Sequence, residues 1–164
     1  MGMLGVYMMV NQDILDKLKE LDEELIEKID ELEKTNETYT IDKLWDGLHF
    51  LLTGVSASSP IEGNKLSESV VGVHNFDTNN DVFYSYIEND ELAEIYKAMI
   101  NVNINELEEK FDPKIFGKKK IYPNIWEIER KDELFKELVN EHNGLLKFYE
   151  EALKKDVGII FSVF

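Results

Sequence analysis

Apolar residues form two unbroken runs at opposite ends of the chain. The runs are Met3–Val10 and Val157–Phe164. Neither run alternates with polar positions, and each has the length of a strand, which is typical of strands buried on both faces of a sheet that helices cover. We therefore expect both segments to be central strands and to pair with each other.

Between these runs, most apolar positions recur every three or four residues, the spacing of one side of a helix. The spacing predicts packing helices within residues 11–32, with a possible break near Leu21, and within residues 89–100, 103–111 and 127–155, the last of which Asn143-Gly144 can interrupt. Asn11 and Asn103 are suitable N-caps. Asp112-Pro113 begins a shorter helical turn, and the lysines at 118–120 after it are expected in a solvated loop.

Residues 40–54 predict a further helix with unusual composition. Its apolar side is made of Leu44, Leu48, Leu51 and Leu52. Thr40 or Asp42 is a possible N-cap, and Gly54 can end the helix in the left-handed conformation. Gly47 costs about 1 kcal/mol relative to Ala inside a helix. We therefore expect another part of the chain to pack closely against Gly47.

Two shorter runs rich in β-branched and aromatic residues, Val70–His74 and Val82–Ile87, predict two more strands. A polar loop at 57–65 and a turn at Asp77–Asp81 precede them. The order of elements indicates a single domain, residues 1–164, of the α/β class, with a small mixed sheet of about four strands. The turn lacks the spacing and terminal Glu of a calcium loop, so no metal is expected there.

Composition restricts the classes of partner. The 164 residues contain 34 Asp or Glu against 18 Lys or Arg, which gives a formal net charge of −16. This charge repels phosphate backbones and anionic lipid, so we expect no direct nucleic-acid binding. Cysteine is absent and no apolar run approaches membrane-spanning length, so we expect a cytoplasmic protein without disulfides or a membrane segment. The acidity suits either plain solubility or a basic protein partner.

Candidate chemistry lies on the side of the 40–54 helix next to its apolar side, which carries Asp42, Trp45, Asp46, His49 and Thr53. A carboxylate three residues before a histidine can orient the imidazole and raise its pKa toward neutrality. The alternative is that His49 is a buried histidine with satisfied hydrogen bonds and Asp46 only its partner. The sequence leaves both interpretations open.

A pocket is predicted where this helix meets the end of the Val70–His74 strand. We expect His49 and His74 to approach each other across a partly exposed concavity that contains Trp45 and borders on the 57–65 loop. Tyr122 or Trp126 is a candidate for its wall, although the segment that holds them also suits a core plug.

Reactive groups at this pocket would include Ser56 or Ser58 as a nucleophile with His49 as base, but the chain has no Gly-x-Ser-x-Gly elbow. Two histidines and Asp46 would equally suit a metal, again without the spacing of a strong motif. The sequence leaves the cofactor unknown. His142, among Glu and Asn, is expected on the exposed side of the last helix.

Four strings, Met1-Gly-Met-Leu-Gly5, Trp45-Asp-Gly-Leu-His-Phe-Leu-Leu-Thr-Gly54, Gly72-Val-His74 and Ile121-Tyr-Pro123, together resemble the YfbM-like family of uncharacterised bacterial proteins. The string that begins at Trp45 is the specific one. The resemblance implies a three-layer α/β/α domain and a bacterial source, and it brings no substrate, cofactor or catalytic residue.

Two functions from different classes follow. One is an acidic binding protein that neutralises a basic partner, as immunity proteins do. The other is a small-molecule enzyme or sensor that uses the pocket lined by His, Asp and Trp. The oligomeric state is open.

Overall fold

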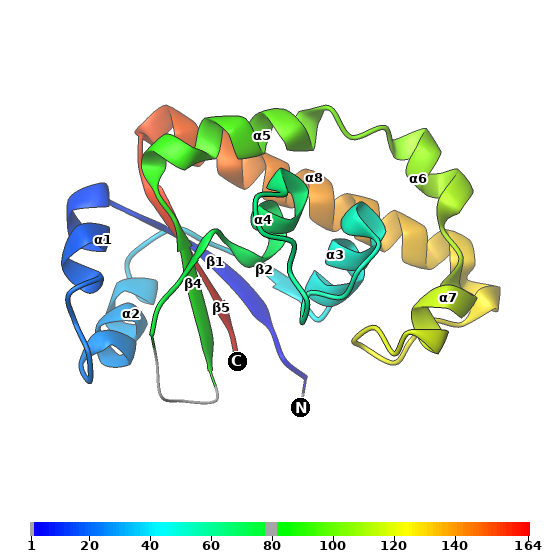
Figure 1. Ribbon diagram of the computed structural model, residues 1–164, viewed down its shortest axis with the longest axis horizontal. Helices are drawn as coiled ribbons and strands as arrows, with labels where there is room; N and C mark the ends of the chain where they lie inside the picture. The colour runs from blue at the N-terminus through cyan, green and yellow to red at the C-terminus, as the bar shows by residue number, and fades with distance from the viewer. Residues whose placement is uncertain (1, 78–81) are drawn as a thin grey trace.

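A five-stranded antiparallel sheet separates two layers of helices in the computed structural model, which describes residues 2–77 and 82–164 (Figure 1). The strand order is β2-β1-β5-β4-β3. The strands are β1 (Gly5–Val10), β2 (Thr38–Asp42), β3 (His74–Asn75), β4 (Phe83–Ile87) and β5 (Gly158–Val163). The three-layer α/β/α class is confirmed. The sheet has one strand more than expected and every pair in it is antiparallel.

The terminal strands β1 and β5 pair side by side in the interior of the sheet, from Gly5 opposite Val163 to Val10 opposite Gly158. Every residue of β1 is buried, and so are the first five of β5. Tyr7 and Met9 belong to the core on one face, whereas Met8 and Val10 belong to the core on the other. Burial on both faces, predicted from the unbroken apolar runs, is confirmed.

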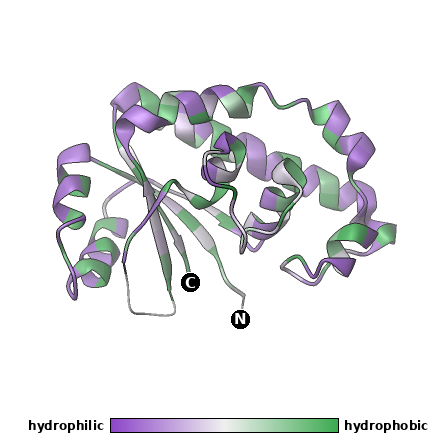
Figure 2. Cartoon of the chain, viewed as in Figure 1, coloured by the Kyte–Doolittle hydropathy of each residue, from purple (hydrophilic) through white to green (hydrophobic). Residues whose placement is uncertain are grey.

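Helices α1 (Gln12–Leu18) and α2 (Leu25–Glu33) cover one face of the sheet. The helical region is interrupted between them, close to the predicted position. At the start of α1 the Asn11 side chain accepts a hydrogen bond from the Asp13 N–H at 2.9 Å. The helices alternate hydrophilic and hydrophobic residues, as expected for elements with one buried side (Figure 2).

The other face carries the remaining helices. They are α3 (Trp45–Thr53), α4 (Lys65–Val71), α5 (Leu92–Ile100), α6 (Ile104–Lys110), α7 (Pro113–Lys118) and α8 (Lys131–Lys155), with short 3-10 turns η1 (Asn89–Glu91) and η2 (Ile128–Arg130). Helix α8 continues through Asn143-Gly144. Tyr39 of β2 occupies the space above Gly144, where a Cβ atom would lie 2.1 Å from the Tyr39 hydroxyl. No helix among the described residues is long and apolar enough to cross a membrane.

Two predicted boundaries are wrong for local reasons. The strand expected at Val70–His74 is wrong at its start, because Val70 and Val71 are the last residues of helix α4, which the Asn64 side chain caps at the N–H groups of Leu66 and Ser67 at 3.0 Å. Strand β3 contains only His74 and Asn75. The helix expected from residue 40 begins at Trp45, because residues 38–42 form the edge strand β2. Its end at Gly54, with φ of 83°, is as predicted.

The turn predicted at Asp77–Asp81 lies mostly outside the described residues, which omit 78–81.

Gly47 supplies the close contact that its place in a helix predicted. A Cβ atom at this position would lie 2.5 Å from the Trp126 ring and 3.3 Å from Leu138. Trp126 is 8% exposed and its indole N–H donates to the Ile121 carbonyl at 2.7 Å, so the ring is held in place. Because Gly47 has no side chain, the 121–126 segment can pack directly against α3.

Gly47→Ala is therefore expected to destabilise the protein. Overpacking costs about 1–3 kcal/mol, more than the roughly 1 kcal/mol that Ala gains over Gly in a helix. Urea denaturation measures the difference in the free energy of unfolding. The matched control is Gly117→Ala in α7, where the nearest atom to a new Cβ is 4.0 Å away, and which should be neutral or stabilising. A Gly47→Ala protein as stable as the control would contradict the packing argument.

Candidate functional site

A pocket of about 200 Å³ lies where α3 and the residues after it meet β4 and β5. The described residues that line it are Trp45, Asp46, Ser56, Ala57, Ser58, Val71, Phe83, Phe161 and Val163. Five of them are apolar or aromatic groups from the sheet, α4 and α3, and the polar ones sit on α3 and the loop. The pocket thus contains Trp45 and borders on the 57–65 loop, and neither His49 nor His74 lines it.

Asp46 is the hydrogen-bonding centre of the pocket edge and is 5% exposed. Its Oδ1 accepts from the Ser56 hydroxyl at 2.8 Å and from the Ala57 N–H at 2.7 Å, and its Oδ2 accepts from the Tyr122 N–H at 2.8 Å. Backbone N–H groups only donate, and an ionised carboxylate only accepts. The surroundings of Asp46 therefore suit the charged form, which ties the loop and the 121–123 segment to α3.

Trp45 lies beside Asp46 with its ring tilted against that of Tyr122, with centroids 5.6 Å apart and an interplanar angle of 30°. The Trp45 indole N–H donates to the Met3 carbonyl at 3.0 Å, and the Met3 N–H donates to the Tyr122 hydroxyl at 2.7 Å. Tyr122 thus supports the pocket from behind Trp45. Trp126 instead fills the core against Gly47, as the alternative of a core plug proposed.

His49 is completely buried and has partners other than Asp46. Its Nδ1 lies 2.8 Å from the Val55 carbonyl, which requires a proton on Nδ1, so Nε2 accepts from the Ser67 hydroxyl at 2.7 Å. Thr53 donates to the His49 carbonyl at 2.7 Å. Burial lowers the pKa of His49, the opposite of the direction that an Asp46 partner would give. His49 therefore holds the loop between α3 and α4 as a neutral, satisfied histidine.

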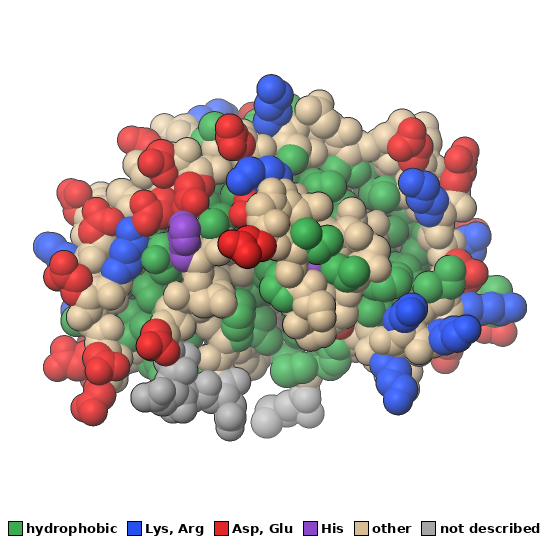
Figure 3. Space-filling model, viewed as in Figure 1, with side chains coloured by type: hydrophobic (Ala, Val, Ile, Leu, Met, Phe, Trp, Pro, Cys, Tyr) green, Lys and Arg blue, Asp and Glu red, His purple; other side chains and the backbone are tan. Residues whose placement is uncertain are grey.

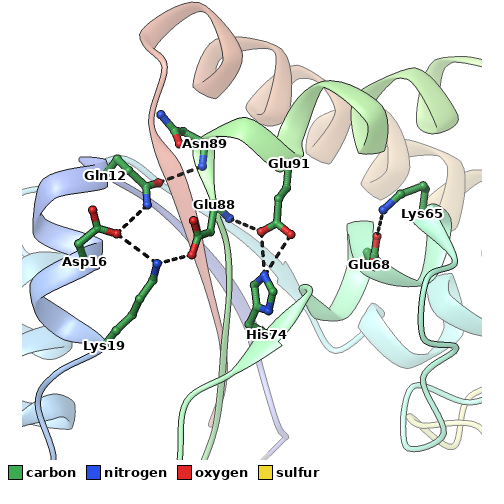
Figure 4. A network of polar contacts seen from close by, with 9 residues as sticks. All are labelled: Gln12, Asp16, Lys19, Lys65, Glu68, His74, Glu88, Asn89 and Glu91. Carbon is green, nitrogen blue, oxygen red and sulfur yellow. Dashed lines mark hydrogen bonds and ion pairs between the residues drawn. The ribbon is translucent and has the colours of Figure 1, made fainter.

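His74 belongs to a separate surface network (Figure 4). Its Nε2 lies 3.0 Å from both carboxylate oxygens of Glu91, and its ring stacks on Tyr86 at 5.0 Å. Lys19, directly after α1, pairs with Glu88 in the same network. The expectation that His49 and His74 share a concavity is therefore wrong, because the Val55 carbonyl satisfies one imidazole and the half-buried carboxylate of Glu91 satisfies the other.

The predicted serine nucleophiles do not meet a base. The Ser56 hydroxyl donates to Asp46, and the Ser58 hydroxyl donates to Ser56 at 3.0 Å. The serine that faces His49 is Ser67, which is 1% exposed and also accepts from the Ile61 N–H at 3.0 Å. Within the described part of the chain, no group of three or more His, Asp or Glu side chains is placed to hold a metal ion.

His142 is buried rather than exposed, at 3%. It faces α5, where its Nε2 lies 3.3 Å from the Met99 carbonyl, and its Nδ1 has no hydrogen-bond partner. The neighbouring Glu and Asn side chains suggested an outer position. That prediction is wrong because polar neighbours in the sequence of a helix say little about which side of the helix a single residue occupies.

The apolar residues that line the pocket were not predicted from the sequence. Phe83, Phe161 and Val163 come from strands that are neighbours only in the folded sheet, with Phe83 opposite Val163. Only the pairing register of β5 against β4 identifies these residues as neighbours. A sequence without known strand pairs does not contain that register.

Comparison with known proteins finds one family along almost the whole chain. The family model described as "Domain of unknown function (DUF1877)" matches residues 1–162. The Escherichia coli (strain K12) protein called Protein YfbM is 31% identical over 157 residues, covering 94% of each chain. The crystal structure of a protein of unknown function YfbM from Escherichia coli superposes with a TM-score of 0.86 at 26% identity, covering 98% of this chain and 99% of that one.

The buried histidines predict a pH dependence of stability. Burial lowers the pKa of His49 and of His142, so near their ordinary value of about 6.5 the unfolded chain binds protons more readily than the folded one. Their contribution is complete above that value and is lost as the pH falls through it. The free energy of unfolding, measured in urea, should fall more steeply from about pH 7.5 to about pH 5.5 in the natural protein than in the double variant His49→Gln, His142→Gln. Parallel curves for the two proteins would contradict this assignment.

Proposed function

This chain belongs to the DUF1877 family, and we propose that this member of the family works by binding a small ligand in the pocket beside Trp45. The observation that carries the proposal is an apolar floor with a few polar groups converging at one edge, the usual composition of ligand sites. A cavity of about 150 Å³ holds a benzene molecule, so about 200 Å³ suits a ligand of only a few more atoms.

Binding is favoured over catalysis by the groups at the pocket. Its lining offers one carboxylate and two hydroxyls, and each of these already has a partner within the chain. A general base must lie within hydrogen-bond reach of the substrate, and a serine nucleophile also needs a base beside it. The imidazoles that would activate a serine lie outside this pocket and bond to other residues. The alternative function of a small-molecule enzyme is therefore the weaker one.

A fragment screen tests the ligand-binding proposal. Thermal denaturation and ligand-observed NMR with a library of small fragments should find compounds that bind and raise the melting temperature, because ligands that bind only the folded state stabilise it. Val163→Phe, which fills the pocket, should abolish this effect.

The matched control for that screen is Ile115→Phe, which also replaces an aliphatic side chain by Phe, at a residue of α7 that is 46% exposed and outside the pocket. It should keep the binding. Fragments that bind equally well to Val163→Phe would place their site elsewhere, and a library without any binder would overturn the proposal.

A second proposed function, an acidic surface for a basic protein partner, is supported by uneven charge. Residues 12–37 contain eleven Asp or Glu and four Lys, whereas residues 110–120 contain five Lys and one Asp. Acidic side chains gather over the α1 and α2 side of the molecule, at the left in Figure 3, and lysines over the α7 end at the right. Such a surface attracts basic partners and opposes nucleic acid and anionic lipid. We expect the partner in the cytoplasm, in keeping with the absence of cysteine.

Capture from cell extract at low and high salt tests the second function. Glu23→Lys combined with Glu27→Lys, both exposed on the α1–α2 side, should abolish capture of a salt-sensitive partner. Glu108→Lys combined with Glu109→Lys on α6 changes the net charge equally and should leave the capture intact. If both pairs of substitutions have the same effect, or if high salt releases nothing, a specific acidic face is refuted.

A further inference from the structure

The hydrogen-bonding capacity that remains in the Trp45 pocket is that of acceptors. Every side-chain donor in its described lining is in use: the Trp45 indole on Met3, the Ser56 hydroxyl on Asp46, and the Ser58 hydroxyl on Ser56. Asp46 Oδ1 accepts two hydrogen bonds, but Oδ2 accepts only one and can take another. The Ser58 oxygen also keeps free lone pairs. A ligand whose polar group is an acceptor, such as a carboxylate or phosphate, would find no side-chain donor here.

The charge of the pocket is negative. Asp46 is the ionisable side chain among the described lining residues, and it is 5% exposed. A charge that is shielded from water acts more strongly on a nearby ion than one on the surface. The formal net charge of −16 adds a long-range attraction for cations.

Three aromatic side chains, Trp45, Phe83 and Phe161, make up much of the remaining wall. Phe83 and Phe161 meet edge to face with centroids 6.1 Å apart. Aromatic rings attract organic cations, Trp most strongly, and aromatic cages are the usual environment in which proteins recognise quaternary ammonium groups. An inorganic cation is a poor match, because calcium takes six to eight oxygen ligands and magnesium requires an octahedral set.

From these three properties we infer that the ligand of the Trp45 pocket is a small alkylated ammonium ion. Its methyl or methylene groups pack on the aromatic and aliphatic wall, and its positive charge lies near Asp46. A primary ammonium presents three N–H donors, whereas only two side-chain atoms of this edge, Asp46 Oδ2 and the Ser58 oxygen, have acceptor sites left, so tertiary and quaternary ammonium groups fit better. The inference rests on the proposed ligand-binding function and narrows it to one class.

The test compares two probes of one shape on the natural protein. Choline carries a trimethylammonium group, and its neutral isostere carries a tert-butyl group in the same place. Calorimetric titration should show that choline binds about ten-fold or more tightly than the isostere, as expected for the cation–π and carboxylate contributions. Trp45→Leu should weaken choline about ten-fold and change the isostere much less.

A matched control is Phe50→Leu, an aromatic of the same helix α3 that packs on Phe116 outside the pocket and should leave both affinities unchanged. Equal or tighter binding of the neutral isostere would overturn the ammonium inference and leave ligand binding standing. The same holds if neither probe binds while other fragments occupy the pocket. Failure of every fragment would refute the proposed function itself.

Discussion

The buried carboxylate of Asp46 is the interaction on which the pocket depends. A charge removed from water is costly unless it is paired or hydrogen-bonded, by several kcal/mol in real proteins. Asp46 meets this requirement with donors from the adjacent residues Ser56 and Ala57 and from Tyr122, which is 76 residues away in the sequence. Satisfying one side chain thus fixes the positions of the loop after α3 and of the segment behind Trp45, and the pocket edge is where they meet.

The apolar floor of the same pocket comes from β4 and from the last strand of the chain, β5. β1 and β5 lie side by side inside the sheet, and both termini emerge at the same end of it (Figure 1). Phe161 and Val163 line the pocket at that end. A site whose wall uses β5, which is held between β1 and β4, exists only once the sheet has formed, so its stability is coupled to that of the whole domain.

The three histidines show that local sequence does not identify the hydrogen-bond partners of a side chain. His49 is a neutral link between two helices, His74 is an exposed partner of Glu91, and His142 is buried with one nitrogen unpaired. The spacing of Asp46 and His49 does place both on α3. They nevertheless bond to other groups instead of to each other: Asp46 to the loop after α3 and to Tyr122, and His49 to the Val55 carbonyl and to Ser67 of α4, because buried backbone groups there also need partners.

The sequence by itself determined the layers of this protein. Unbroken apolar runs at 3–10 and 157–164 identified two interior strands, because a strand buried on both faces has apolar residues at every position. Apolar residues at every third or fourth position, together with caps such as Asn11, identified most helices, because these are buried on one side only. The glycine contact at position 47 was also visible, since glycine inside a helix needs a packing reason. Only the tertiary structure decided the edge strand β2, the helix at 65–71, the partners of each histidine and the lining of the pocket. These depend on strand register and on which polar groups remain unsatisfied after packing, and both are properties of residues that are distant in the chain.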